Sequence, residues 1–208
     1  MRIESLASQQ DRVGRYRVVL ETGEIMRLYR QTVEDFGIYP GKELADDELE
    51  ALRTAAGKMS AKMRAVRIVS ASSVSKKDLE HRLVQKGEDP TQAKEAVEWM
   101  ADLSLIDDEK TAEQVVQRCI SKGYGISRAK QALYEKRIPK KYWGAALAEY
   151  PDQAERILDF LCARLDADAQ EKDVKKAVDA LLRRGHSYPQ IRRGLEQLRL
   201  DFEDFREE

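Results

Sequence analysis

The feature that most constrains this chain is a helical pattern that recurs along it. In the clearest copy, apolar residues at helical spacing end at Lys122-Gly123, and a second helical pattern begins after Gly125. A cation followed by glycine is a typical helix ending, because the cation offsets the negative helix end and glycine readily takes left-handed dihedrals. Asp107 and Asp108 precede the first helix, where short carboxylates accept free amide N–H groups. The pattern predicts two helices joined by a tight turn.

Two further copies lie 50 residues earlier and 62 residues later than this one. The aligned residues of the second helix are Ser75, Leu79, Leu83 and Lys86, then Gly125, Ala129, Leu133 and Lys136, then Ser187, Ile191, Leu195 and Leu198. The larger shift also places Arg184-Gly185 on Lys122-Gly123. Repeated units of this kind stack to bury apolar faces that one unit cannot bury alone. We interpret the pattern as three copies of a three-helix unit.

The first thirty residues follow a different pattern. Tyr16–Leu20 and Glu24–Tyr29 are rich in β-branched and aromatic residues and flank Thr22-Gly23, a typical tight turn, and Ile3–Ala7 is a candidate third strand. So small a sheet must pack on the first helices to be stable. The predicted fold is mainly α, with tandem three-helix repeats in an elongated array and a small N-terminal antiparallel β segment.

We expect four segments along the chain. They are an N-terminal β segment with short helices (1–57), a first three-helix repeat (58–107), a second (108–150), and a third with an extra or lengthened leading helix (151–208). Within them, Asp46 or Asp47, Ser75 and Asp89-Pro90 are expected to begin helices. The apolar residues expected to face inward from the helix near residues 51–70 and from the helix after Pro90 are Met59, Met63, Val66, Val69, Ala93, Val97, Met100 and Leu103.

No catalytic or metal-binding constellation is evident in the sequence. His81, His186, Cys119 and Cys162 lie too far apart for the close ligand pairs that zinc sites use, and both nucleotide-binding fingerprints are absent. Helix capping accounts for the carboxylate pair Asp107-Asp108. With 36% charged and 42% hydrophobic residues, the composition suits helices with a narrow apolar stripe better than a large α/β enzyme. We expect no metal, no cofactor and no enzymatic activity.

Three sequence features predict the cellular compartment of the protein. Residues 1–5 are not followed by an apolar core of signal-peptide length, and no run approaches the roughly 20 apolar residues needed to cross a bilayer. Cys119 and Cys162 both fall on apolar helical stripes, which predicts buried thiols in a reducing environment. We expect a cytoplasmic protein.

A formal net charge of −1 conceals an uneven distribution. Residues 122–144 hold seven cations and one anion, a local net charge of +6, and residues 181–199 hold five arginines and one anion, a net charge of +4. The first 57 residues have a net charge of −3, and the segment from Asp201 adds five acids and one arginine. Such asymmetry is typical of a protein that approaches a polyanion with one face.

The candidate binding residues come from these two basic segments. Lys130 and Arg137 are seven residues apart and hence share a helix stripe, opposite Ala129 and Leu133. The complete candidate set is Lys122, Arg128, Lys130, Arg137, Lys140, Lys141, Arg183, Arg184, Arg192 and Arg193. The aromatic residues among them, such as Tyr134 and Trp143, either stack on exposed bases of single-stranded DNA or belong to the core, and the sequence leaves both readings open.

The motifs described above resemble those of the RecX family of bacterial recombination regulators. The resemblance rests on the order and spacing of Leu105–Glu109 with Ala112, Lys122-Gly123, Leu133–Lys136, and Arg183–Tyr188 with Ile191 and Leu195, together with Gly37-Ile38, Gly41-Lys42 and Leu44. It covers nearly the whole chain. Three positions depart from the family pattern: Arg137 stands where glycine is usual, Thr111 where an aromatic residue is common, and His186 where phenylalanine is common.

The resemblance implies a regulator of homologous recombination and DNA repair that binds the RecA recombinase and its filaments on DNA and modulates its recombinase and ATPase activity, with inhibition as the expected direction. In the implied mechanism the array lies in the groove of the RecA–DNA filament, bridges neighbouring subunits and alters filament growth. Contacts with single- or double-stranded DNA are compatible with this mechanism, and a monomer is the default expectation.

Two other functions fit the residues without the resemblance. A helical module that binds DNA autonomously would bind duplex DNA tightly by itself, with a steep salt dependence. A helical scaffold that binds only protein partners would keep its binding after charge reversal of the cluster between Lys122 and Lys141. Only the resemblance selects RecA among possible partners.

Overall fold

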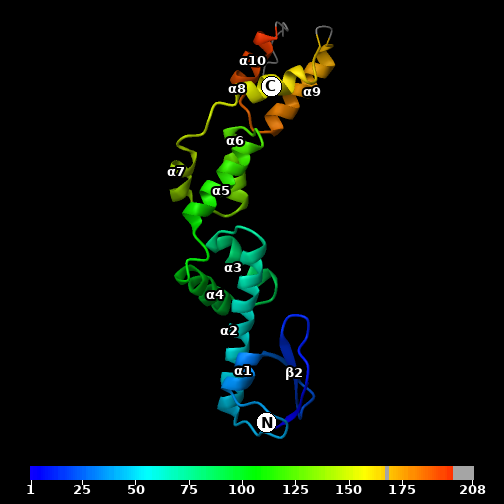
Figure 1. Ribbon diagram of the computed structural model, residues 1–208, viewed down its shortest axis with the longest axis vertical. Coiled ribbons are helices and arrows are strands. Elements are labelled where there is room, and N and C mark those ends of the chain that lie inside the picture. Colours follow the sequence, from blue (N-terminus) through cyan, green and yellow to red (C-terminus); the bar gives the residue numbers. More distant parts are fainter. Residues whose placement is uncertain (167–168, 199–208) are drawn as a thin grey trace. The chain divides into compact units, whose positions relative to one another are not determined.

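Three antiparallel strands open the chain in the computed structural model, which describes residues 1–166 and 169–198 (Figure 1). They are β1 (Ile3–Leu6), β2 (Arg15–Leu20) and β3 (Ile25–Tyr29), in the spatial order β1-β2-β3. β2 and β3 form a hairpin in which Val19 pairs with Ile25, and Gly23 takes a left-handed φ of 82° in the turn. The predicted N-terminal antiparallel β segment is confirmed.

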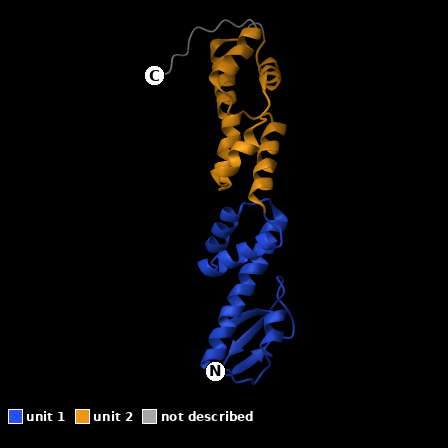
Figure 2. Cartoon of the chain, turned by 90° about the vertical axis from the view of Figure 1, so that its left-hand side faces the viewer, with its two compact units in different colours: residues 1–106 blue, residues 107–208 orange. Residues whose placement is uncertain are grey.

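A long helix, α2 (Asp46–Ala71), belongs to two hydrophobic cores of residues 1–106, the first of two compact units (Figure 2). Near its beginning, Leu49 and Leu52 pack with the sheet and with the segment that follows α1 (Arg30–Asp35). Further along, Ala61 and Ala65 pack with α3 (Lys76–Gln85) and α4 (Pro90–Asp102). The small sheet is therefore stabilised by the same helix that begins the first helical core.

The inward face of α2 differs from the expected one. Ala61 and Ala65 are fully buried, whereas the predicted inward residues Met59 and Met63 are only half-buried. Small side chains let two helices approach closely. That close approach is visible at Gly57, where a Cβ atom would lie 2.3 Å from the Gln92 side-chain oxygen. The prediction was wrong for Met59 and Met63, because closely packed helices bury small side chains at their contact, whereas Val66 and Val69 pack against the core as expected.

Helix caps were mostly predicted correctly. The Ser75 hydroxyl accepts the Asp78 amide, and the Asp89 carboxylate accepts two amides at the start of α4. At α2, however, Ala45 occupies the cap position, and its N–H donates to Glu48 Oε2 at 3.0 Å. Asp46 and Asp47 lie inside the first turn, where carboxylates favour the positive helix end. Leu103, expected to face inward, follows the end of α4 and is 51% exposed.

The second unit, residues 107–208, contains two further helical cores. One is formed by α5 (Asp108–Ser121), α6 (Ile126–Glu135), the 3-10 helix η1 (Lys140–Tyr142) and α7 (Trp143–Leu147). The other is formed by α8 (Ala154–Cys162), α9 (Glu171–Arg183) and α10 (Tyr188–Gln197). α8 precedes its two partners in the chain and supplies Ile157 and Leu161 to their core. The mainly helical fold is confirmed, whereas the four-segment division stays a prediction.

The two cysteines differ in exposure. Cys119 is buried in α5, as expected, and burial raises the pKa of its thiol. Cys162, the last residue of α8, is exposed. The prediction failed for Cys162 because Ile157, Leu161 and Leu165 define the inward face of this segment, and the residue directly after Leu161 lies beside that face. In the described residues, no helix is long and apolar enough to span a membrane.

The two helical cores of the second unit meet through equivalent turns. The Gly125 amide donates to Arg184 O at 2.9 Å, and the Ser127 amide donates to Gly185 O at 3.3 Å. A Cβ atom on Gly125 would lie 2.0 Å from Gly185 O, and one on Gly185 would lie 2.3 Å from the Arg128 amide nitrogen. Backbone touches backbone here, so neither position has room for a side chain.

We predict that Gly125→Ala destabilises the second unit by about 2 kcal/mol or more, because the added methyl group forces the two turns apart. Gly144→Ala is the matched control: Gly144 lies in α7 with open space around its Cβ position. Alanine there should stabilise by about 0.5–1 kcal/mol through its higher helix propensity. Urea denaturation followed by Trp143 fluorescence, in a Trp99→Phe background, measures both effects. Equal stability of the two variants would contradict the close backbone contact.

Candidate partner-binding surface

The outward side of α6 carries a row of solvent-facing residues. Ile126, Lys130 and Tyr134 follow one another at intervals of four residues and therefore share one face of α6, and the exposed Arg137 follows two residues beyond the last helical residue. These four residues are hereafter called the α6 stripe. Tyr134 is 68% exposed and Ile126 39% exposed. The opposite face of the helix supplies Ala129 and Leu133, both fully buried. Burial of that face determines which side chains of α6 point outward.

Arg137 follows the end of α6 with a left-handed φ of 53°. Its amide donates to Tyr134 O, and the next amide, that of Ile138, donates to Leu133 O. This is the hydrogen-bonding pattern in which a helix usually ends on glycine. The geometry accounts for the departure noted at this position: Arg137 keeps the backbone conformation that suits glycine and adds an exposed cation.

Three further candidate cations lie on the segments flanking α6. Lys122 ends α5 and lies with its Nζ 6.0 Å from the centre of the Tyr124 ring. Lys140 and Lys141 are both exposed on η1, and Lys141 Nζ lies 4.7 Å from the centre of the Tyr142 ring. A cation over an aromatic face keeps its charge accessible while its position is restrained.

Arg128, although predicted as a binding residue, is engaged within the chain. Its Nη1 lies 3.0 Å from Glu135 Oε1, and this ion pair raises the pKa of Arg128 and lowers that of Glu135. The Arg128 backbone also packs against Gly185 at the contact between the turns. Its charge is thus largely offset by a neighbour on the same helix.

The cations of α9, α10 and the turn between them also fall into two groups, those with contacts inside the chain and those that face solvent. Arg184 stacks on Phe160, with its guanidinium carbon 4.3 Å from the ring centre, and Arg192 Nε pairs with Glu196 Oε1 at 3.0 Å. Arg183 and Arg193 are exposed, and Arg193 Nε donates to Pro189 O at 3.4 Å. The structure brings Arg128 and Arg184 to the same contact between turns, away from the outward α6 stripe. Arg199 and the acidic segment from Asp201 lie outside the described residues.

Tyr134 lies outside the predicted set of binding cations, and the sequence left open whether it is exposed or belongs to the core. It was grouped with aromatic residues that divide between core and surface. Trp143 and Tyr142 are half-buried against the core formed by α5, α6 and α7. Tyr134, in contrast, lies on the outward face between Lys130 and Arg137. The signal was its spacing of four residues from Lys130 on α6, on the side opposite Leu133.

His186 lies buried at the contact between the two turns. Its Nε2 is 3.0 Å from Gly123 O, and because a carbonyl only accepts, Nε2 carries the proton. Nδ1 is buried and has no hydrogen-bond partner. Burial, with a smaller effect of the neighbouring Arg184 cation, lowers the pKa of His186, and the Gly123 carbonyl partly opposes this. Nearby, the Tyr150 hydroxyl donates to Tyr124 O at 2.7 Å, and burial raises the pKa of Tyr150 to about 12.

The surface of the second unit presents exposed cations and aromatic side chains. Within residues 1–166 and 169–198, no three metal-ligating side chains gather in one place. The features that do gather are exposed cations and a tyrosine on helices fixed by buried cores. Fold and surface together define a mainly helical protein with a small N-terminal sheet and exposed cations on its second unit.

Comparison with known proteins gives the family. The chain is 32% identical to the regulatory protein RecX of Xanthomonas campestris pv. campestris over 144 residues, which cover 68% of this chain and 87% of the relative. It is 29% identical to the regulatory protein RecX of Vibrio campbellii over 154 residues, covering 70% of this chain and 93% of that protein. No family model matches. This chain belongs to the RecX family of regulatory proteins.

Solved structures agree with this assignment. A crystal structure of regulatory protein RecX superposes with a TM-score of 0.61 at 20% identity, covering 96% of this chain and 99% of the other, and so supports the fold. The crystal structure of RecX from Lactobacillus salivarius gives a TM-score of 0.58 at 25% identity, covering 71% of this chain and 99% of that one.

We predict that Arg137→Gly stabilises the second unit by about 0.5–1 kcal/mol. Glycine removes the steric cost of a left-handed residue, and this gain exceeds the entropy that glycine adds to the unfolded chain. Urea denaturation with Trp143 as the probe measures the change. Arg137→Ala serves as the control, because alanine removes the cation and retains the strain. A stability gain of equal size in both variants would mean that charge, and not backbone geometry, is responsible.

We predict that the second unit loses stability as the pH falls below about 6.5, the value of an unfolded histidine. Since the folded state holds the pKa of His186 lower, the unfolded state binds more protons in this range, and protonation favours unfolding. Urea denaturation at pH 7.5 and 5.5 measures the difference. His186→Phe should reduce it, and His81→Phe, in the other unit, should leave it in place. An unchanged difference in His186→Phe would assign the effect to other groups.

Proposed function

We propose that this chain regulates a RecA-type recombinase by binding its filament on DNA and lowering its ATPase and recombinase activity. The proposal joins membership of the RecX family, a family of regulatory proteins, with the charges of the second unit. The observation that carries it is the α6 stripe. Lys130 and Arg137 project from it as exposed cations, and among the described residues neither pairs with a carboxylate.

Cations that already form contacts within the chain are weaker candidates for partner binding than cations that face solvent. Arg128 and Arg192 already form ion pairs and Arg184 stacks on Phe160, so each would have to give up an internal contact before it could bind a partner. Lys130, Arg137 and Arg183 have no such contact to lose among the described residues. We therefore assign partner binding chiefly to these three, with Lys122, Lys140 and Lys141 as supporting cations.

Binding of this kind regulates without chemistry of its own. The exposed cations attract the phosphates or acidic side chains of a filament and accelerate encounter, and Tyr134 adds a planar apolar surface that strengthens the docked state. A helix face bound across a filament obstructs the movements that accompany the partner's ATP hydrolysis. In this proposal the protein acts by binding and requires no cofactor.

One observation favours a second function, direct DNA binding. α6 is the second helix of a pair joined by the turn at residues 122–125, the position that reads the major groove in helix-turn-helix proteins. An exposed tyrosine and cations on that helix suit DNA as well as a filament. The two functions differ in whether the recombinase is required.

The test is the single-stranded-DNA-dependent ATPase of the same organism's recombinase, titrated with this protein up to one copy per filament subunit. We expect the rate to fall. For the variant Lys130→Glu/Arg137→Glu/Arg183→Glu, the concentration for half-maximal inhibition should rise about tenfold, which corresponds to about 1.4 kcal/mol of binding free energy.

The control variant Lys77→Glu/Lys94→Glu/Lys172→Glu changes the net charge equally at exposed positions outside the α6 stripe. Its inhibition should stay within about twofold of the unmodified protein. No inhibition at saturation, without co-sedimentation on filaments, would refute the regulatory proposal. Duplex binding without the recombinase, lost in the first variant alone, would favour the DNA-binding alternative.

A further inference from the structure

A groove of about 460 Å³ in the first unit is lined by cations from three separate parts of the chain. One wall is the end of the loop before β2, the second is the C-terminal half of α2, and the third is the C-terminal half of α3 with the residue that follows it. The five lining cations are Arg15, Arg64, Arg67, Arg82 and Lys86. None belongs to the α6 stripe or to the other candidate cations of the second unit.

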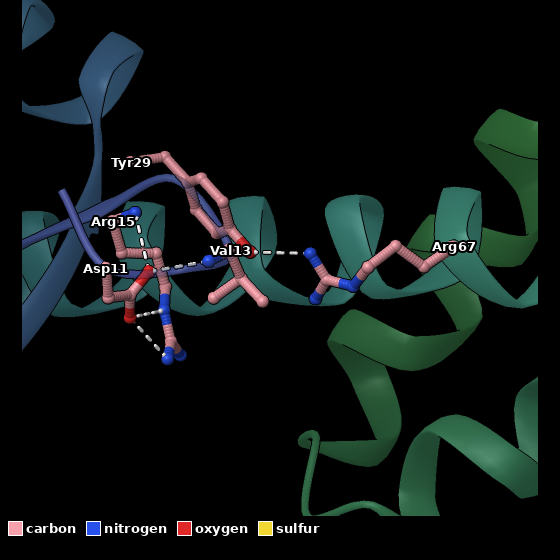
Figure 3. Close-up of polar contacts among 5 residues, drawn as sticks. All are labelled: Asp11, Val13, Arg15, Tyr29 and Arg67. Atoms are coloured by element: carbon pink, nitrogen blue, oxygen red, sulfur yellow. Dashed lines mark hydrogen bonds and ion pairs between the residues drawn. The ribbon is translucent and has the colours of Figure 1, made fainter.

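Three of the five are neutralised inside the protein. Arg15 Nη2 lies 2.8 Å from Asp11 Oδ2, as Figure 3 shows, and Arg82 Nη2 lies 2.9 Å from Asp78 Oδ2. Arg64 Nε lies 2.5 Å from Glu88 Oε1. In each pair a carboxylate offsets the charge of the arginine. The three pairs therefore contribute little net positive charge to the groove.

Arg67 and Lys86 are different, because no carboxylate in the described parts of the chain pairs with either. Arg67 extends from α2, and its Nη1 donates to the Tyr29 hydroxyl at 3.2 Å (Figure 3). Tyr29 is buried at the end of β3, so it holds the guanidinium in place without neutralising it. Lys86 ends α3 with an exposed side chain, and its backbone oxygen accepts from Arg64 Nη1. The groove thus keeps two uncompensated positive charges, one of them held by a buried neutral group.

The groove also has an apolar lining. Val13, in the loop two residues before β2 begins at Arg15, is 37% exposed, and Ile68 and Ala71 line the groove from α2. A nucleic-acid backbone, which is polar and charged along its whole length, would leave these apolar groups without a partner. A peptide with a few acidic residues and an apolar side chain matches both the charges and the lining.

We infer that this groove binds a short acidic segment of a partner protein, in which carboxylates meet Arg67 and Lys86 and an apolar side chain packs on Val13 and Ile68. The arrangement gives the first unit an interaction surface of its own. It does not depend on the function proposed for the second unit, and it can be tested without a recombinase.

The experiment measures the fluorescence anisotropy of a labelled peptide of about twelve residues, built from Glu-Glu-Leu repeats, as full-length protein is added. Arg67→Glu/Lys86→Glu should weaken binding about tenfold, because two attractions become repulsions. The control Lys77→Glu/Lys94→Glu makes the same change in charge on exposed positions outside the groove and should weaken binding less than about twofold. A second probe with serine in place of leucine should bind more weakly than the first.

Three results would overturn the inference. The first is an equal loss of binding in both variants, which would indicate unspecific attraction between charges. The second is equal affinity for the leucine and serine probes, which would remove the role of the apolar lining. The third is tight binding of oligothymidylate that is lost in Arg67→Glu/Lys86→Glu, without measurable peptide binding, which would make the groove a nucleic-acid site.

Discussion

The structure depends on how its helices end. α3, α5 and α9 are each followed by a glycine with positive φ, at Gly87, Gly123 and Gly185, and α6 is followed by Arg137 in the same conformation. The left-handed residue closes the helix with hydrogen bonds to its last turn and reverses the chain within a few residues. The next apolar stripe can then face the core that the first stripe began. Each helical core therefore rests on a backbone conformation that few residues other than glycine adopt readily.

The same turns have a second role in the second unit, where Gly125 and Gly185 bring two backbones into contact. The contact is polar, because amides of one turn donate to carbonyls of the other, and it encloses His186. A junction built from backbone groups leaves the outer faces of the helices free to carry charge. This separation of roles explains how an exposed cationic stripe and a rigid junction occur on the same helix pair.

A charged side chain of this protein can be assigned to binding or to stabilisation only when its ion-pair partners within the chain are known. Arg128 and Lys130 are two residues apart on α6, yet one is paired with Glu135 and the other faces solvent. In the first unit, Arg64 and Arg67 show the same contrast within a single helical turn. A count of cations treats the members of each pair alike, whereas the structure distinguishes cations that stabilise the fold from cations that can meet a partner.

Short-range signals in the amino-acid sequence account for most of the secondary structure. Helical spacing, caps such as Ser75 and Asp89, and glycines after helix ends predicted the helix pairs and the β hairpin, because these signals act within a few residues. The outward direction of Lys130 followed from the same periodicity. Three features arise from the packed structure: Ala61 and not Met59 faces the core, Arg128 pairs with Glu135, and Arg15, Arg67 and Lys86 line one groove. Those outcomes depend on how closely helices approach and on which distant side chains meet, and such distances arise only when the chain packs.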